Sequence, residues 1–239
     1  MGARKTGRFP RGKLKNKSFA RKKASKNTVP FVLIVCEGSK TEHEYLNWFR
    51  KSGKLTNVKI HLLEKGTKSS PMSVAAEALK KIKRTGPSNE GGFDKLFCVI
   101  DRDTHADFES GCKLIEAIPS QCGSGYITKG VELILSVPCF EFWLLCHFLK
   151  TRMPFIRTQQ KSPCDNVIDE LRKIPSFKDY DRKSKGIFEG QWNELVGHYE
   201  KAVSNAEYTL SEYEKEGEIN PSTNVHHLTE YLQGRRRAD

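Results

Sequence analysis

The chain has 239 residues, of which 37% are hydrophobic, and a formal net charge of +12; its mean hydropathy is -0.60. These values are typical of a soluble protein with one large domain or two small ones. No apolar run approaches the ~20 residues that a membrane span requires, and no apolar stretch follows the basic N-terminus, which excludes a secretory signal. We therefore expect a cytoplasmic protein without a membrane partner.

The positive charge is concentrated at the N-terminus. Residues 1–28 contain eleven Lys or Arg and no Asp or Glu, whereas the rest of the chain has 30 basic and 29 acidic residues. A segment with so much charge of one sign and little to bury is predicted to be a disordered arm. It is either an electrostatic tether for a nucleic-acid backbone or a tail that only increases solubility.

Strand and helix patterns alternate from residue 31 to residue 149. Continuous apolar runs such as FVLIVC are typical of strands buried on both faces. The expected strands are 31–36, 58–63, 95–101 and 131–137, and the expected helices are 41–53, 70–84, 108–118 and 139–149. This order predicts an α/β fold with a mainly parallel sheet flanked by helices.

Two helix starts carry capping signals. Ser39 with Glu42 fits a capping box for the first helix, and Ser70 followed by Pro71 fits the start of the second. Gly111 weakens the third helix.

The pattern changes at about residue 150. Helical patterns follow at 164–174, 190–215 and 223–234, with Ser222 and Thr223 as the expected cap of the last. We expect a basic arm at 1–28, an α/β domain at 29–150 and a helical extension at 151–239.

Seven cysteines are scattered along the chain without a Cys-x-x-Cys pair. Most lie in apolar surroundings, which is typical of reduced, buried thiols in a cytosolic protein. We therefore expect neither a disulfide framework nor a zinc site.

Two of the expected strands end on acids. Glu37 follows the first strand, and Asp101 and Asp103 lie at the end of the third. Ligands of parallel α/β sheets bind outside the carboxyl ends of the strands, and three carboxylates in a small volume require a cation or a proton. Oxygen ligands favour Mg²⁺ or Mn²⁺, so the pattern predicts a metal site for phosphoryl chemistry.

Each acid also has a structural interpretation. Asp-x-Asp after a strand is common as a turn or a helix cap, and Glu37 fits the first turn of a helix. The segment GSKT is not a phosphate-binding loop, because its lysine follows Ser39 instead of glycine.

Further polar residues are candidates near these strand ends. His105 positions water or phosphate, or is an exposed loop histidine. Glu141 is a metal ligand or water holder, or an acid favoured by the helix dipole. Glu42 points into the site, or only caps the helix, whereas His147 is predicted to be a core histidine because it lies among aromatic and aliphatic residues.

Basic residues near the acids and in one later loop are candidates for nucleic-acid contact. That loop mixes cations with Tyr180, a combination that suits backbone and base contact, although a solvated basic loop is the default interpretation. The candidates are Lys40, Arg102, Lys178, Arg182, Lys183 and Lys185.

Four segments together resemble a known family. They are IVCEGSKTE, VIDRDTH, SVPCFEFWLLCHF and NPSTNVHHL, in this order, between residues 34 and 228. This set resembles the RloB-like proteins, which are assigned to the Toprim superfamily. Only the basic arm lies outside it.

The resemblance implies a Toprim-like catalytic domain in which Glu37 is the first-motif glutamate and Asp101 and Asp103 are the D-x-D pair. It implies a divalent metal, phosphodiester cleavage and a role in bacterial anti-phage defence. AriB, the effector of the PARIS system, is similar and cleaves tRNA, which adds tRNA to the implied substrates and a defence-system ATPase to the implied partners. One departure is Ser136-Val137-Pro138, where the family pattern favours Asn-Pro, and it leaves the place of Glu141 open.

The leading hypothesis is therefore a metal-dependent nuclease acting on RNA, tRNA or DNA. The alternative is a non-catalytic nucleic-acid-binding or adaptor module in which the acids are structural. A receiver domain is disfavoured, because its site needs an acidic pair at one strand end and a lysine on a later strand. The oligomeric state is left open.

Overall fold

The computed structural model describes residues 29–38, 40–63, 67–102, 107–181, 189–217 and 219–235, with the side chains of residues 189, 214 and 216 left out. The predicted arm at residues 1–28 lies outside this part of the chain.

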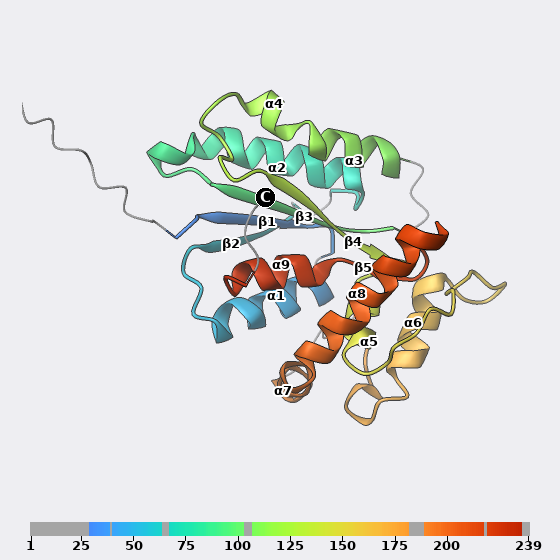
Figure 1. Ribbon diagram of the computed structural model, residues 1–239. Coiled ribbons are helices and arrows are strands. Elements are labelled where there is room, and N and C mark those ends of the chain that lie inside the picture. Colours follow the sequence, from blue (N-terminus) through green and yellow to red (C-terminus); the bar gives the residue numbers. More distant parts are fainter. Residues whose placement is uncertain are drawn as a thin grey trace, which may run out of the picture.

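One sheet of five strands forms the centre of the molecule (Figure 1). Its order is β2-β1-β3-β4-β5, with the first four strands parallel and β5 antiparallel to β4. The strands are β1 Val32–Cys36, β2 Val58–Leu62, β3 Lys95–Asp101, β4 Val131–Val137 and β5 Ser222–Thr223. The predicted α/β class with a mainly parallel sheet is confirmed, and the Toprim assignment stays a prediction.

Helices cover both faces of this sheet. Helices α2, α3 and α4 pack on one face, while α1 and α9 lie across the other, next to α5, α6, α7 and α8 (Figure 1). Their bounds are α1 Thr41–Ser52, α2 Pro71–Thr85, α3 Phe108–Glu116, α4 Ile118–Cys122, α5 Glu141–Cys146, α6 Pro163–Leu171, α7 Glu189–Gly197, α8 Tyr199–Glu216 and α9 Val225–Leu232.

Strand β1 shows why a continuous apolar run is needed. Val32, Ile34 and Cys36 pack into the core beneath α1 and α5, whereas Leu33 and Val35 pack into the core beneath α2 and α3. Successive side chains of a strand point to opposite faces, so a strand covered on both sides has no solvent-facing position.

Helix α1 begins at Thr41 with Lys40 at the N-cap, and the predicted cap Ser39 lies outside the described residues, so its capping box with Glu42 stays a prediction. One local prediction is wrong. Ser222 and Thr223 form β5, and the N-cap of α9 is Asn224. The predicted Ser70 cap is confirmed, because its hydroxyl accepts the Ser73 N–H at 3.3 Å.

The C-terminal helices share a hydrophobic core with the sheet. Leu171, Leu195 and Leu228 belong to the same buried cluster as Ile34 and Phe97. The division at residue 150 stays a prediction, and it can be tested through the unfolding behaviour of this core.

Gly111 has a packing role that helix propensity does not show. A β-carbon at this position would lie 2.4 Å from Cβ of Pro71 and 2.8 Å from the backbone nitrogen of Met72. Glycine therefore allows α3 to approach the first turn of α2, and these backbone neighbours cannot move aside as a flexible side chain would.

We expect Gly111→Ala to lower the free energy of unfolding by about 1–3 kcal/mol, because overpacking outweighs a propensity gain of up to about 1 kcal/mol. Urea denaturation measures the effect. Gly190→Ala in α7 is the matched control, since a β-carbon there meets no atom of the described residues within 4 Å. A stabilised Gly111→Ala variant would contradict the close-packing interpretation.

His147 is the core histidine that the sequence predicts. It is fully buried, and its Nδ1 lies 3.0 Å from the Trp143 carbonyl oxygen. Burial lowers the pKa of its imidazole to about 3, so the folded protein keeps it neutral.

Below about pH 6.5 the unfolded chain protonates His147 while the folded chain does not, so the free energy of unfolding falls as the pH drops from 6.5 toward 3. We expect His147→Gln to flatten this part of the stability profile by up to about 1.4 kcal/mol per pH unit. Thermal denaturation of both proteins across this range measures it. Identical profiles for wild type and His147→Gln would contradict the prediction.

Candidate active site

The carboxyl ends of β1 and β3 bring two of the predicted acids together. Cys36 pairs with Val99 in the parallel register, and the Glu37 N–H continues the ladder by donating to the Val99 carbonyl at 3.0 Å. Beyond the ladder, the Asp101 N–H donates to Oε2 of Glu37 at 3.3 Å. The neighbouring strands thus place Glu37 directly beside Asp101, as the hypothesis of a shared site requires.

Glu37 is held in a defined orientation. Its side chain is largely buried, and its Oε1 accepts the Ser69 hydroxyl at 3.1 Å. Ser69 lies just before α2 and is not among the candidate residues that the sequence suggests. The carboxylate is therefore oriented by two donors that are distant from it in the chain.

Glu42 adds a third carboxylate at this edge. It is buried, and a β-carbon on Gly38 would lie 2.1 Å from both of its carboxylate oxygens. Because Gly38 has no side chain, the carboxylate of Glu42 can lie against the loop after β1. Burial, and next the negative charge of Glu42, raise the pKa of the Cys36 thiol, which also places Glu42 close to the end of β1.

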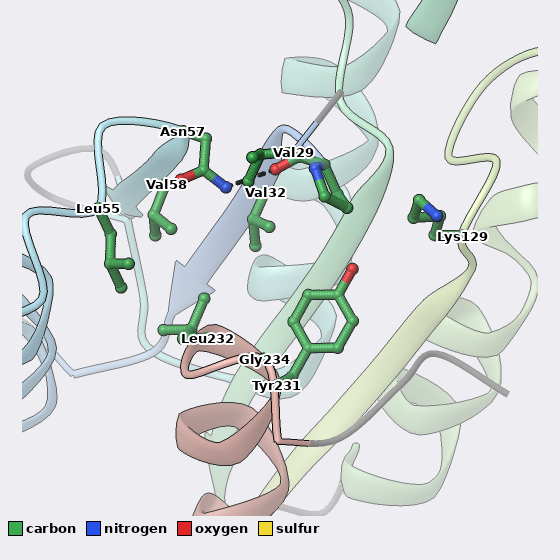
Figure 2. A pocket seen from close by; sticks show the side chains of 10 residues that line it. Val29, Val32, Leu55, Asn57, Val58, Lys129, Tyr231, Leu232 and Gly234 are labelled. Atoms are coloured by element: carbon green, nitrogen blue, oxygen red, sulfur yellow. Dashed lines mark hydrogen bonds between the residues drawn. The ribbon is translucent and has the colours of Figure 1, made fainter. Parts of the chain in front are cut away.

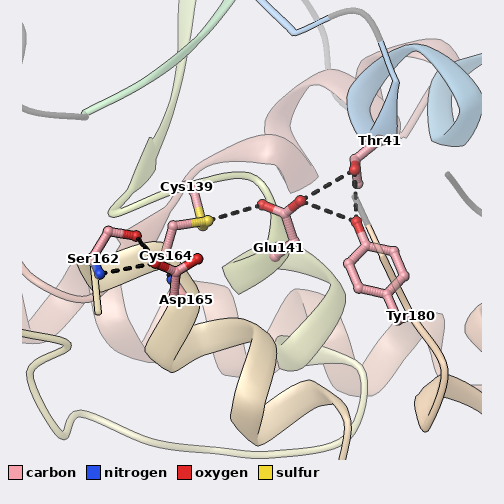
Figure 3. Close-up of a disulfide and its surroundings, with 7 residues drawn as sticks. All are labelled: Thr41, Cys139, Glu141, Ser162, Cys164, Asp165 and Tyr180. Atoms are coloured by element: carbon pink, nitrogen blue, oxygen red, sulfur yellow. Dashed lines mark hydrogen bonds between the residues drawn. A yellow bond between two sulfur atoms is a disulfide. The ribbon is translucent and has the colours of Figure 1, made fainter. Parts of the chain in front are cut away.

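Glu141, the first residue of α5, is anchored on one side by two hydroxyls (Figure 3). Its Oε1 accepts Thr41 Oγ1 at 3.1 Å and the Tyr180 hydroxyl at 3.0 Å. Burial, and next the charge of Glu141, raise the pKa of Tyr180, so this hydroxyl keeps its proton and stays a donor. The network joins α5 to the first turn of α1.

Tyr180 is therefore not a base-stacking residue, which removes the base-contact alternative that the sequence left open beside a solvated basic loop. Its side chain is 1% exposed, whereas a nucleobase needs an open ring face. The candidate cations Lys40, Arg102 and Lys178 are exposed, and the Arg102 guanidinium lies 5.3 Å from the Phe108 ring centre.

Five of the predicted site residues lie outside the part of the chain that the structure describes, and their placement stays a prediction. They are Asp103, His105, Arg182, Lys183 and Lys185.

The expectation that no disulfide forms is wrong for one pair. Cys139 and Cys164 are bonded, with their α-carbons 5.8 Å apart and a separation of 25 positions in sequence (Figure 3). The bond joins the turn between β4 and α5 to the start of α6. The remaining cysteines are free, and Cys36, Cys98 and Cys146 are buried as expected.

Two sets of donors are chemically suited to metal ions. Glu37, Glu42 and Asp101 offer only oxygen at the acidic edge, the ligand type that Mg²⁺ and Mn²⁺ prefer, although their ligand atoms do not all lie within 4.8 Å of one another. Among the described residues, the group of three donors that lie within 4.8 Å of one another is Cys139, Glu141 and Cys164, and this set combines sulfur with oxygen.

A cavity of about 250 Å³ lies beside the carboxyl ends of β3 and β4. Its lining includes Arg102, Pro138, Cys164 and Asn220. The cavity therefore extends from the carboxyl end of β3, where Asp101 lies, to Cys164 of the disulfide.

A larger cavity, of about 410 Å³, lies at the opposite edge of the sheet (Figure 2). It is lined by residues around the start of β1 and the end of α9, including Val29, Tyr231 and Gly234. Asn57 Nδ2 donates to the Pro30 carbonyl there at 2.6 Å. This cavity is remote from the acids, because it lies at the start of β1 and Glu37 follows the end of the same strand.

Across the described segments, no helix is both long and apolar enough to cross a membrane.

A family model described as "RloB: RloB-like protein" matches residues 32–232. The chain belongs to the RloB-like family. The match begins at the first residue of β1 and ends with α9, so it spans the sheet, the acidic edge and the C-terminal helices of this RloB-like protein. Searches of curated proteins and of solved structures find no match.

Proposed function

We propose that this RloB-like protein is a divalent-metal-dependent nuclease that hydrolyses phosphodiesters, with RNA, tRNA or DNA as substrate, and that it acts as an anti-phage defence effector. The observation that carries the proposal is the position of Glu37. It is a largely buried carboxylate at a strand end, beside Asp101 on the neighbouring parallel strand. Buried acids gathered at the carboxyl edge of such a sheet are the usual composition of a site for metal and phosphate.

Glu37 and Asp101, with Asp103, would hold Mg²⁺ or Mn²⁺. The bound cation would polarise the phosphate and lower the pKa of its bound water. Ser69 fixes the orientation of Glu37 through a 3.1 Å hydrogen bond to Oε1, and the Asp101 N–H holds Oε2 at the end of β3.

Glu42 adds negative charge that would strengthen cation binding, and His105 is the remaining candidate for handling a proton. Glu141 bonds to Thr41 and Tyr180, which supports a role in positioning the start of α1 next to the acids.

The exposed cations at this edge would bind the substrate. Arg102 directly follows Asp101, and its exposed guanidinium is within reach of a phosphate bound at the strand ends. Lys40 and Lys178 are also exposed and are suited to contacts that fix the backbone without reading sequence.

Sequencing of cellular RNA and DNA ends tests the proposal and identifies the substrate class. We expect induction of the wild type to create new ends in one nucleic acid and Asp101→Asn to create none. The purified protein should lose cleavage in EDTA and regain it with Mn²⁺ or Mg²⁺. Equal cleavage by wild type and Asp101→Asn, or cleavage unaffected by EDTA, would overturn the proposal.

A binding module without catalysis is the second candidate. The observation in its favour is that Glu37 links three segments through its contacts with Ser69 and Asp101, which alone explains why an acid is placed there. This candidate predicts nucleic-acid binding that persists in EDTA together with unchanged RNA and DNA ends in cells.

Deletion of residues 1–28 is expected to weaken nucleic-acid binding and its salt dependence under either function. Each of the eleven cations that pairs with a phosphate contributes about 0.9 to the slope of log K against log salt on duplex DNA. Binding titrations at several salt concentrations measure that slope. An unchanged slope would show that the arm only increases solubility.

A further inference from the structure

Cys139, Cys164 and Glu141 form a compact group of buried donors that the nuclease proposal does not use as a unit. Their side chains are 2%, 8% and 3% exposed, respectively, and their donor atoms lie within 4.8 Å of one another. Two elements supply them. Cys139 and Glu141 come from the turn into α5, and Cys164 is the second residue of α6.

The carboxylate of Glu141 is aimed at the sulfur atoms. Thr41 and Tyr180 both donate to Oε1, so Oε2 faces the sulfur of Cys164 at 3.4 Å (Figure 3). A sulfur in a disulfide carries no hydrogen to donate. In the oxidised chain this buried oxygen therefore faces an electron-rich atom, and no ion pair among the described residues supplies it with a positive partner.

We propose that the reduced chain binds a zinc ion through the thiolates of Cys139 and Cys164 and through Oε2 of Glu141. Thiolates with a carboxylate favour Zn²⁺ over Mg²⁺ or Mn²⁺, which prefer oxygen alone. Two thiolate ligands about 2.3 Å from a tetrahedral ion lie about 3.8 Å apart, which α-carbons 5.8 Å apart can provide after small side-chain rotations.

The surroundings are those of a supported ligand set. Metal-binding carboxylates are usually hydrogen-bonded through their other oxygen, as Oε1 is here. The start of α6 is fixed by a reciprocal capping box between Ser162 and Asp165, and the positive end of that helix favours a thiolate at Cys164. The cavity that reaches Cys164 provides an entry path and space for water as a fourth ligand.

The ion would connect two parts of the chain. It joins the turn after β4 to α6, so it stabilises the same junction that the disulfide holds in the oxidised chain. Zinc and the disulfide exclude each other, because the ion needs both sulfurs as thiolates. The ligands of this site do not include Glu37 or Asp101 of the proposed nuclease centre, and the two sites are linked through the contact of Glu141 Oε1 with Thr41 at the start of α1.

Zinc content of the full-length protein tests the proposal. A phosphine reductant and water convert the disulfide into two thiols, and each thiol loses its proton when it binds the metal. After equilibration with Zn²⁺ and removal of the excess, we expect one zinc per chain in the wild type and none in Cys139→Ser or Cys164→Ser. Cys112→Ser, at a free and partly buried cysteine outside the group, should retain it, as should Glu37→Gln.

Tyr180→Phe distinguishes ligand positioning from simple folding. It keeps the ring but removes one donor to Oε1, and we expect the zinc affinity to fall about tenfold while the fold is retained. With Co²⁺ in place of zinc, the reduced wild type should show thiolate-to-cobalt charge-transfer absorption, a direct readout that does not depend on any variant.

Three results would overturn the proposal. These are a folded, reduced wild type without zinc, zinc that stays bound while the Cys139–Cys164 disulfide is intact, and a cobalt complex without thiolate absorption. Equal zinc loss in Cys112→Ser and Cys164→Ser would have the same consequence.

Discussion

Glu37→Gln is expected to reduce phosphodiester cleavage by at least about a thousandfold while the protein stays folded. The amide is a poor ligand for Mg²⁺ or Mn²⁺, and its NH₂ group cannot accept the bonds that Oε1 and Oε2 accept from Ser69 and Asp101. Loss of one such bond costs about 1–2 kcal/mol, which a folded domain tolerates. Cleavage rates of a labelled substrate under single-turnover conditions measure the effect.

The matched control is Glu132→Gln, on strand β4 of the same sheet. Glu132 lies near the opposite edge of the sheet and pairs with Lys95 at 3.2 Å. The same chemical change there should leave cleavage unchanged. If Glu37→Gln cleaves like the wild type, or if its circular dichroism shows that it is unfolded, the role of Glu37 in cleavage is not supported.

Trp143→Ala is expected to lower the free energy of unfolding by about 3–5 kcal/mol, the usual cost of removing a large aromatic side chain from a core. Trp143 is fully buried and makes ring contacts with Tyr45 of α1, Tyr199 of α8 and His226 of α9. Its loss should weaken the sheet side and the C-terminal helices together. Urea denaturation followed by circular dichroism and by the fluorescence of Trp48 and Trp192 measures it.

The shape of the transition is as informative as its midpoint. A common core predicts one transition with coincident probes in the wild type, whereas an independent extension at 151–239 predicts two. Met153→Ala, at a side chain 73% exposed, is the control and should change stability by less than about 0.5 kcal/mol. Two separated transitions would support the division at residue 150.

The sheet was predictable because its strands carry a local signal. The run from Phe31 to Cys36 is apolar at every position, and each residue is needed on one of two covered faces. Strand β5 has two residues, too few for any periodicity, and it exists only because the chain returns beside β4. Helix α1 begins at Thr41, and the buried Glu42 lies against Gly38, a contact that no local pattern marks.

The acids of the candidate site could be predicted, but their supports could not. Glu37 and Asp101 occur at the ends of apolar runs, which topology brings to one edge. Ser69 contacts Glu37 from 32 positions away in the sequence, and Tyr180 contacts Glu141 from 39 positions away. No local sequence pattern marks such partners. Cys139 and Cys164 were missed for the same reason, since their pairing depends on how α6 packs against α5.

The two ends of the described fold lie together at the edge of the sheet that faces away from the acids. Val29 and Gly234 line the same cavity (Figure 2). A short linker from the end of α9 to the start of β1 could therefore close the chain, and new ends could be opened in an exposed loop, as in circular permutants of other domains. A fluorescent label or a surface anchor joined at residue 235 would stand on the far side of the molecule, leaving the carboxyl edge open to a long polymer such as nucleic acid.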